Sequence, residues 1–163
     1  MKRWIAVLAA GLVGSTLSVP AAVADTCRTN WGSVDKANRS LGNGLVTGLR
    51  AGGHACFDRF VVAGGVGYQV GYVSVLRADA SDRVIPLAGG ARLRIVVLGQ
   101  LQGNRLPSIP PVVGMRSFRQ VKWAGNFEGV NSVGLGVRAK LPFRVFTIGG
   151  AHPRVVIDVA HHW

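Results

Sequence analysis

Short apolar segments interrupted by glycine run through the chain after residue 44, and they constrain its fold more than any other feature of the sequence. None keeps an apolar spacing of about 3.6 residues over roughly three turns, as a convincing amphipathic helix requires. In residues 91–98, aliphatic side chains alternate with Arg92 and Arg94, which is the period of a strand with one buried face. The sequence therefore predicts an all-β chain.

Turn-forming residues separate these segments about every ten residues. We expect eight strands, over residues 45–51, 56–62, 68–76, 91–98, 118–123, 132–140, 143–149 and 154–160. Residues 52–55 have the length of a hairpin loop, and a further turn is expected at Gly125-Asn126. Residues 99–114 carry three prolines, which cannot donate to a central ladder, so this segment is expected to be a surface loop or a crossing between sheets. The pattern favours a single antiparallel β-sandwich, with a barrel as the alternative.

The first 24 residues have the three parts of a secretory signal peptide. Lys2 and Arg3 precede an apolar run over residues 4–13, and a small-residue cleavage site ends at Ala24. An uncleaved anchor is the alternative, but glycine, serine and proline dilute residues 14–20, and a span needs about 20 predominantly apolar residues. We therefore expect cleavage after Ala24 and a secreted or envelope-associated protein.

The remaining residues fit one domain. Residues 25–44 are polar, lack a sustained period and are expected to form an irregular arm, followed by the β domain over residues 45–163. Arginines and one lysine interrupt the most apolar part of the domain, so no transmembrane span is expected in the mature chain.

Basic residues outnumber acidic ones, 19 against 7 in the whole chain and 17 against 7 once Lys2 and Arg3 are removed with the signal peptide. Such an excess favours anionic partners, although net charge alone names none and can simply keep a protein soluble. Specific recognition of nucleic acid is disfavoured by the expected export.

Cys27 and Cys56 are the two cysteines of the chain. An even number in an exported protein favours a disulfide over a metal site, and here only one pairing is possible. The bond would tie the arm to the first hairpin.

No catalytic or metal-binding signature is recognisable. His161 and His162 are adjacent, so in a strand they point to opposite faces, and neither they nor His54 and His152 have the spacing of a zinc site. There is no G-x-S-x-G motif for a nucleophilic serine. No metal and no cofactor are expected.

Carboxylates remain the one possible source of acid–base chemistry. A small hydrolase that uses Asp58, Glu128 or Asp158 is an alternative function, but neighbouring arginines keep carboxylates ionised, the reverse of what a general acid requires. Glu128 and Asp158 are instead expected to form structural ion pairs across strands with Arg144 and Arg154. Arg154 and Asp158 lie about 13 Å apart along one strand and cannot pair with each other.

Several short motifs occur in an order that resembles the AMIN-like domain of secreted and lipoprotein-type actinobacterial proteins. They are Leu49-Arg50-Ala51-Gly52, Cys56-Phe57-Asp58-Arg59, Gly67-Tyr68-Gln69-Val70, Phe127-Glu128-Gly129, Gly134-Leu135-Gly136-Val137, Pro142-Phe143-Arg144-Val145 and the segment 153–159. The resemblance covers about residues 31–163. It implies a β-sandwich similar to the AMIN domain, a non-catalytic module that targets cell-wall amidases to the envelope by binding peptidoglycan. No amidase domain follows in this chain, so delivery of an enzyme in cis is not expected.

The sequence thus predicts a non-catalytic module that binds an anionic cell-wall polymer, peptidoglycan or an envelope protein. The expected contact surface combines cationic side chains with one aromatic platform: Arg92, Arg94, Arg116, Arg119, Lys122 and Trp123. Trp123 also fits the core, as large aromatic residues commonly do. A third possibility is a carrier of lipid or another small molecule, because 48% of the residues are hydrophobic.

Overall fold

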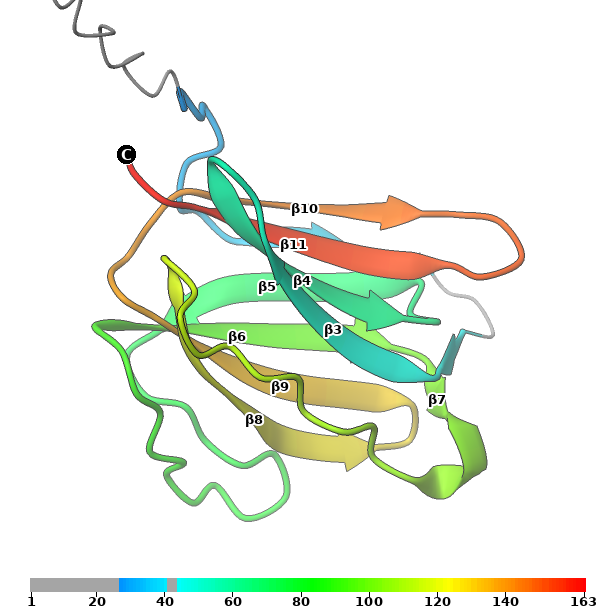
Figure 1. Cartoon of the computed structure of the whole chain (residues 1–163). Helices are drawn as coiled ribbons and strands as arrows, with labels where there is room; N and C mark the ends of the chain where they lie inside the picture. The colour runs from blue at the N-terminus through cyan, green and yellow to red at the C-terminus, as the bar shows by residue number, and fades with distance from the viewer. Residues whose placement is uncertain (1–26, 41–43) are drawn as a thin grey trace, which may run out of the picture.

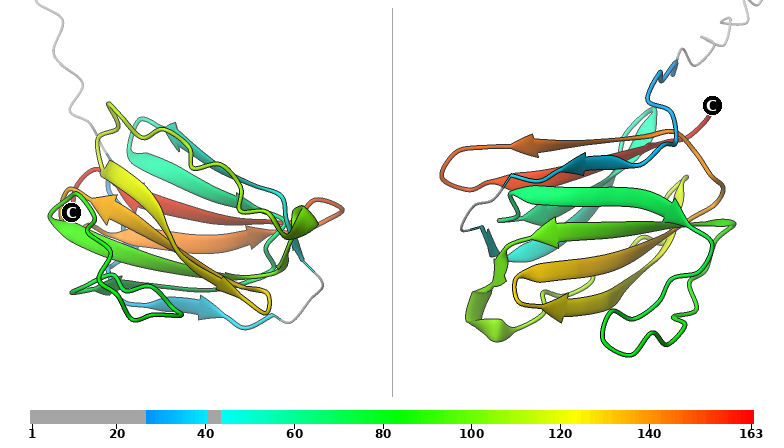
Figure 2. Two further views of the ribbon diagram at one scale, coloured as in Figure 1. Left: turned by 90° about the horizontal axis from the view of Figure 1, so that it is seen from below. Right: turned by 180° about the vertical axis from the view of Figure 1, so that it is seen from behind.

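Two antiparallel sheets lie face to face in the computed structural model, which describes residues 27–40 and 44–163 (Figure 1). The expected signal peptide and its cleavage point after Ala24 lie outside the described residues. The all-β prediction is confirmed, and the sheets pack as a sandwich without closing into a barrel (Figure 2).

The larger sheet has five strands in the order β1-β5-β6-β9-β8. They span Lys36–Asn38 (β1), Gly67–Val73 (β5), Ala91–Leu98 (β6), Val130–Val137 (β9) and Phe118–Phe127 (β8). All neighbouring strands are antiparallel.

The smaller sheet has four strands in the order β10-β11-β4-β3. They span Phe143–Ile148 (β10), Arg154–Ala160 (β11), Phe57–Ala63 (β4) and Gly48–Gly53 (β3), again all antiparallel. A short parallel pair, β2 (Leu45–Val46) with β7 (Gln100–Leu101), lies beside the sandwich and is followed by a single 3-10 turn over Gln102–Asn104.

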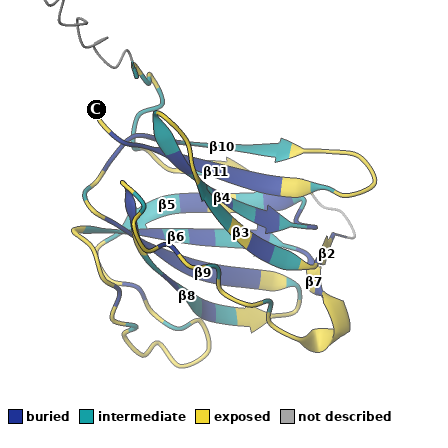
Figure 3. Cartoon of the chain, viewed as in Figure 1, coloured by how far each residue is buried: buried dark blue, intermediate teal, exposed yellow. Residues whose placement is uncertain are grey.

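Alternation along the strands fills the space between the sheets. In β4, residues 58, 60 and 62 are buried while the residues between them are half-buried, and in β6 Leu93, Ile95 and Val97 are buried while Arg92 and Arg94 are half-buried. These two strands therefore turn one face inward, and their buried residues belong to one hydrophobic cluster with buried residues of both sheets, whose buried segments are dark blue in Figure 3. A filled interior argues against the carrier alternative.

Strand ends differ from the expectation at several places. β8 continues to Phe127, so the turn expected at Gly125-Asn126 was wrong, and the chain reverses at Glu128-Gly129. Both of these residues have positive φ, 47° and 78°, as a tight hairpin turn requires. Gly125 lies within β8 at an irregularity in the pairing with β9, and its lack of a Cβ leaves room for the Asp79 side chain.

Two N-terminal segments also differ. The arm expected to be irregular includes β1, which pairs with β5 at the sheet edge. The strand expected over residues 45–51 divides at Thr47 into β2 and β3, because Thr47 donates its backbone N–H to Ala63 while Leu45 and Val46 pair with β7. The hairpin around residues 52–55 is confirmed.

The connection between β5 and β6, residues 74–90, folds over the outer face of the five-stranded sheet. Gly134 lacks the Cβ that would collide with the Leu76 side chain, and Gly136 lacks one that would collide with the Ala88 carbonyl. Leu76, Leu87 and Ala124 form a second buried cluster there. Glycines in β9 thus let a loop lie directly on the sheet.

A disulfide between Cys27 and Cys56 joins the arm to the start of β4, as predicted. The C-terminal residues lie beside this bond, since His161 donates its backbone N–H to the Cys56 carbonyl. Both ends of the described chain therefore meet at one end of the sandwich (Figure 1). Within the described residues, no helix has the length and apolar character needed to cross a membrane.

Candidate functional site

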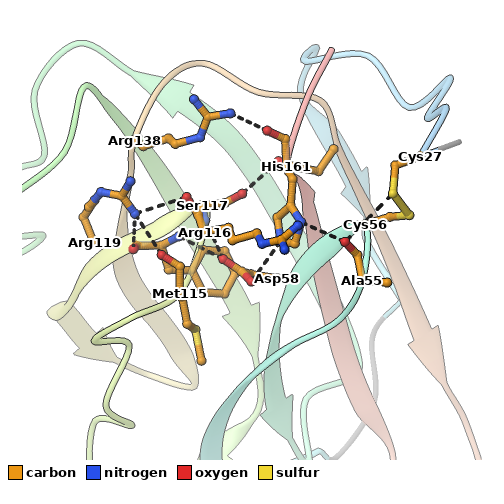
Figure 4. A network of polar contacts seen from close by, with 12 residues as sticks. Cys27, Ala55, Cys56, Asp58, Met115, Arg116, Ser117, Arg119, Arg138 and His161 are labelled. Carbon is orange, nitrogen blue, oxygen red and sulfur yellow. Dashed lines mark hydrogen bonds and ion pairs between the residues drawn. A yellow bond between two sulfur atoms is a disulfide. The ribbon is translucent and has the colours of Figure 1, made fainter. Parts of the chain in front are cut away.

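The inner face of the four-stranded sheet carries one buried carboxylate, Asp58, at the end where the disulfide lies (Figure 4). Its Oδ2 accepts backbone hydrogen bonds from Ser117 at 2.6 Å and Phe118 at 3.2 Å. Its Oδ1 lies 3.1 Å from Nε2 of His161. Asp58 therefore joins three segments, β4, the start of β8 and the C-terminal end.

The juxtaposition of Asp58, His161 and Ser117 has the residue types of a hydrolytic triad but not its geometry. Nδ1 of His161 lies 3.2 Å from the Ala55 carbonyl, so both ring nitrogens face oxygen acceptors and neither is available to activate a nucleophile. The Ser117 hydroxyl donates to the Ala160 carbonyl at 2.9 Å, and its side chain is buried. This cluster is therefore a structural latch.

Basic side chains surround the latch without entering it. Arg138 donates through Nη2 to the His161 carbonyl, which holds the C-terminal residues in place. Arg119 donates through Nη1 to the carbonyls of Met115, Arg116 and Phe118 and thereby closes the turn before β8 (Figure 4).

A second buried carboxylate, Asp158, lies on the opposite, outer face of the same sheet. Arg59 donates to its two oxygens from Nε at 2.6 Å and from Nη2 at 2.9 Å, and Arg144 donates from Nε at 2.8 Å. These residues are direct neighbours across β4, β11 and β10. The hydrogen bond to Asp158 raises the pKa of Arg59 above its usual value. Asp158 is fully buried because the two guanidinium groups cover it.

Aromatic rings cover the two arginines in turn. The guanidinium carbon of Arg144 lies 4.4 Å from the ring centre of Trp31, and that of Arg59 lies 5.2 Å from the ring centre of Phe57. Phe146 lies within 5.6 Å of both. Trp31 comes from the disulfide-bound arm, so the arm completes this stack of rings and arginines.

The three carboxylates considered for hydrolysis are not brought together. Asp58 and Asp158 lie on opposite faces of one sheet, each held by its own donors, and Glu128 is exposed in the turn between β8 and β9. Of the ion pairs expected from sequence, the structure contains the pair of Asp158 with Arg144 and adds Arg59. Within the described residues, neither Glu128 nor Arg154 forms an ion pair.

Of the six residues expected to form a binding surface, Arg92, Arg94 and Lys122 share the outer face of the five-stranded sheet, and the other three lie elsewhere. Arg94 pairs with Asp79 at 2.7 Å, and Lys122 donates to the Pro86 carbonyl at 2.7 Å, so both hold the loop over residues 74–90. Arg92 lies on the same outer face of β6. Arg116 and Arg119 are exposed at the start of β8.

Trp123 packs against the core between the sheets and donates its ring N–H to the Pro107 carbonyl at 3.0 Å. It therefore anchors the proline-containing loop that follows β7.

The histidines do not converge. His54 stacks on Phe57 at 4.5 Å, and the rings of His161 and His162 lie 6.4 Å apart at 87°. Over residues 27–40 and 44–163, no three His, Cys, Asp or Glu side chains come close enough to share a metal ion.

A groove of about 850 Å³ crosses the outer face of the four-stranded sheet. Its floor is made of small aliphatic side chains, Ala63 and Val61 from β4 and Val156 from β11. Longer side chains border it: Arg50, Arg59, Ile148, His152 and Arg154.

The groove forms because short side chains lie between longer ones on the outer face of the sheet. Small residues occupy the centre of the outer face, and Gly48 at the edge leaves open space where a side chain would stand. Arg50 and Arg154 are exposed, and neither forms a side-chain hydrogen bond or ion pair with the described part of the chain.

Sequence reasoning gave Arg50 no role and assigned Arg154 to a structural ion pair. Arg59 and Val61 alternate with buried residues in β4, which does mark an outer face, but the partner strands that complete the groove could not be identified from local pattern.

A protein-family model described as the AMIN-like domain matches residues 44–161, which is most of the chain. This match indicates an envelope-associated module of a generally non-catalytic kind. Comparisons with curated proteins and with solved structures gave no match.

Proposed function

Because the chain belongs to the AMIN-like domain family, we propose that it is an exported, non-catalytic module that binds an anionic polymer of the cell envelope. The observation that carries the proposal is the pair Arg50 and Arg154, two exposed cations that border one groove without acidic partners in the described residues. Arginines used for folding, such as Arg59 and Arg94, are instead matched with carboxylates. Cations left unmatched beside a groove favour a ligand that supplies the negative charge.

Export is part of the proposal. Residues 1–24 have the composition of a signal peptide, and the disulfide between Cys27 and Cys56 is of the kind that persists in oxidising compartments. Cleavage after Ala24 leaves a chain that begins at Asp25. Amino-terminal sequencing of the protein recovered from culture medium or from a wall fraction tests this step; a protein that retains Met1 would overturn it.

Sedimentation with purified cell walls tests the binding. We expect the mature protein to be retained at low ionic strength and to be released near 1 M salt, where the Debye length falls to about 3 Å. A small β protein without excess basic charge serves as the control for trapping in the pellet. Equal and negligible retention at both salt concentrations would contradict the proposed function.

A further inference from the structure

We propose that the groove on the outer face of the four-stranded sheet is the binding site, and that its ligand is a phosphodiester polymer, in which phosphate groups alternate with short carbon linkers that carry few hydroxyl groups. The inference rests on the proposed function and adds to it a place on the molecule and a ligand chemistry. The groove has a cationic border and an aliphatic floor, and both features point to such a ligand.

The cations that line the groove are suited to phosphate. Arg50, Arg59 and Arg154 all lie on it, and no lysine does. A guanidinium group presents a planar fork of N–H donors that matches two oxygens of one phosphate, which an ammonium group cannot do. Arg59 uses Nε and Nη2 on Asp158, which fixes its orientation, while Arg50 and Arg154 carry no such bond within the described chain.

The spacing of these arginines calls for a ligand with repeated charges. Arg50 is paired with Val61, two residues along β4 from Arg59, so the two arginines are diagonal neighbours at roughly 7–8 Å between Cα atoms. Arg154 pairs with Ala63 at the other end of the floor. It lies four positions before Asp158, the residue opposite Arg59, so the distance from Arg154 to Asp158 along β11 is about 13 Å. A chain with successive phosphates can contact the arginines at both ends while each guanidinium group binds its own phosphate.

The floor between the arginines disfavours a hydroxyl-rich ligand. Ala63, Val61 and Val156 offer no hydrogen-bonding side chains, and Thr47 is the one hydroxyl-bearing residue on the lining. A neutral glycan needs several donors and acceptors for its hydroxyl groups. A chain whose segments between charges are short carbon linkers matches a floor of small aliphatic groups between cations.

The open edge of the sheet gives a long ligand a path. Gly48 of β3 pairs with Ala63 of the groove floor, and a Cβ placed at Gly48 meets nothing within 4 Å. Gly52, four residues further along the same strand, is equally open. A polymer can therefore continue beyond the groove, which an enclosed pocket would prevent.

Direct binding measurements test the assignment with synthetic poly(glycerol phosphate) as the probe and poly-glutamate and neutral dextran as comparison polymers. The mature protein is expected to bind the phosphate polymer more tightly than poly-glutamate of equal charge, and not to bind dextran. The double variant Arg50→Gln with Arg154→Gln is expected to bind the phosphate polymer at least about tenfold more weakly, because two charge-assisted contacts are removed.

The matched control is the double variant Arg83→Gln with Arg105→Gln, which loses the same charge from exposed positions outside the groove. It should retain affinity within about twofold. A steric variant, Ala63→Trp, fills the floor without any change in charge and should also weaken binding. Melting curves of all variants separate loss of binding from loss of folding, and the exposed arginines can be replaced without unfolding the sheet.

Other results of these measurements would each overturn a specific part of the proposal. Equal weakening in the groove and control variants would show that binding follows total charge and would overturn the groove assignment. Equal affinity for poly-glutamate would overturn the assignment to phosphate. If the unmodified protein sediments with cell walls and the groove variant does so equally, this inference fails while the proposed function stands; if the unmodified protein does not sediment, the proposed function itself fails.

Discussion

The Oδ1 atom of Asp58 lies 3.1 Å from Nε2 of His161, 103 residues later in the chain, and both side chains are 2% exposed. This contact ties the end of β11 to the start of β4, next to the disulfide. It explains why the C-terminal residues are ordered parts of the sandwich rather than a free tail.

Replacement of Asp58 tests the latch. Asp58→Ala leaves the backbone N–H groups of Ser117 and Phe118 and the ring of His161 without their acceptor, so the free energy of unfolding should fall by about 3 kcal/mol. Urea unfolding measures this change. Asp82→Asn is the control, because it removes the charge of an exposed ion pair and keeps a residue type suited to the φ of 52° at this position, so it should change stability by less than about 0.5 kcal/mol. Similar values for the two variants would contradict a role for the latch.

Replacement of Asp158 should also lower the free energy of unfolding, because it removes the charge that two arginines share. Asp158→Ala leaves Arg59 and Arg144 close together without the carboxylate between them, and we expect a loss of about 2–3 kcal/mol, below the value for fully buried pairs because both arginines are partly exposed. Glu128→Ala provides the comparison, since Glu128 is exposed and unpaired in the described chain. A melting temperature unchanged by Asp158→Ala would remove this assignment.

Gly134 should tolerate a side chain only if Leu76 is shortened. Gly134→Ala places a Cβ against the Leu76 side chain and should cost about 1–3 kcal/mol through overpacking. In a Leu76→Ala background the same substitution should cost much less, so a double-mutant cycle should give a coupling free energy of about 1 kcal/mol. Additive effects would show that the loop over residues 74–90 does not lie on β9 at this point.

The raised pKa of Tyr72 should make the free energy of unfolding depend on pH in the alkaline range. Burial raises the pKa of Tyr72 to about 12, although the hydrogen bond that the Leu141 backbone N–H donates to the phenol oxygen acts in the opposite direction. In the unfolded chain the Tyr72 hydroxyl loses its proton near pH 10. The contribution of the protonated Tyr72 to folding stability is therefore complete below about pH 10 and is lost as the pH rises through 12. Tyr72→Phe should therefore be less stable at pH 7 but should lose less stability between pH 10 and 12. Parallel curves of unfolding free energy against pH would contradict this.

The disulfide between Cys27 and Cys56 should contribute to stability through the unfolded state. The bond joins positions 29 residues apart, and its loss should lower the free energy of unfolding by about 3–4 kcal/mol in the chain-entropy model. Comparison of the oxidised protein with the variant Cys27→Ser, Cys56→Ser measures this value. Reductant should destabilise the first protein and leave the second unchanged.

The sequence pattern predicted those strands and turns whose residues carry the signal within the element itself. Alternation in residues 91–98 identified β6 with its inner and outer sides, and the glycines near residue 53 identified the hairpin of β3 and β4. The end of β8 was misplaced because Gly125 signals a turn in isolation, whereas here it makes room for Asp79. The two cysteines allowed one pairing, which the structure contains.

The sequence alone determined the β class, the disulfide and the family resemblance, because period, cysteine number and motif order are properties of the chain itself. Only the tertiary structure decided which charges are matched and which are free. Arg59 and Asp158 are 99 residues apart and become neighbours through strand pairing, while Arg154, four residues from Asp158, is left at the groove. Pairing across strands is set by sheet order, which brings together residues that no local pattern connects.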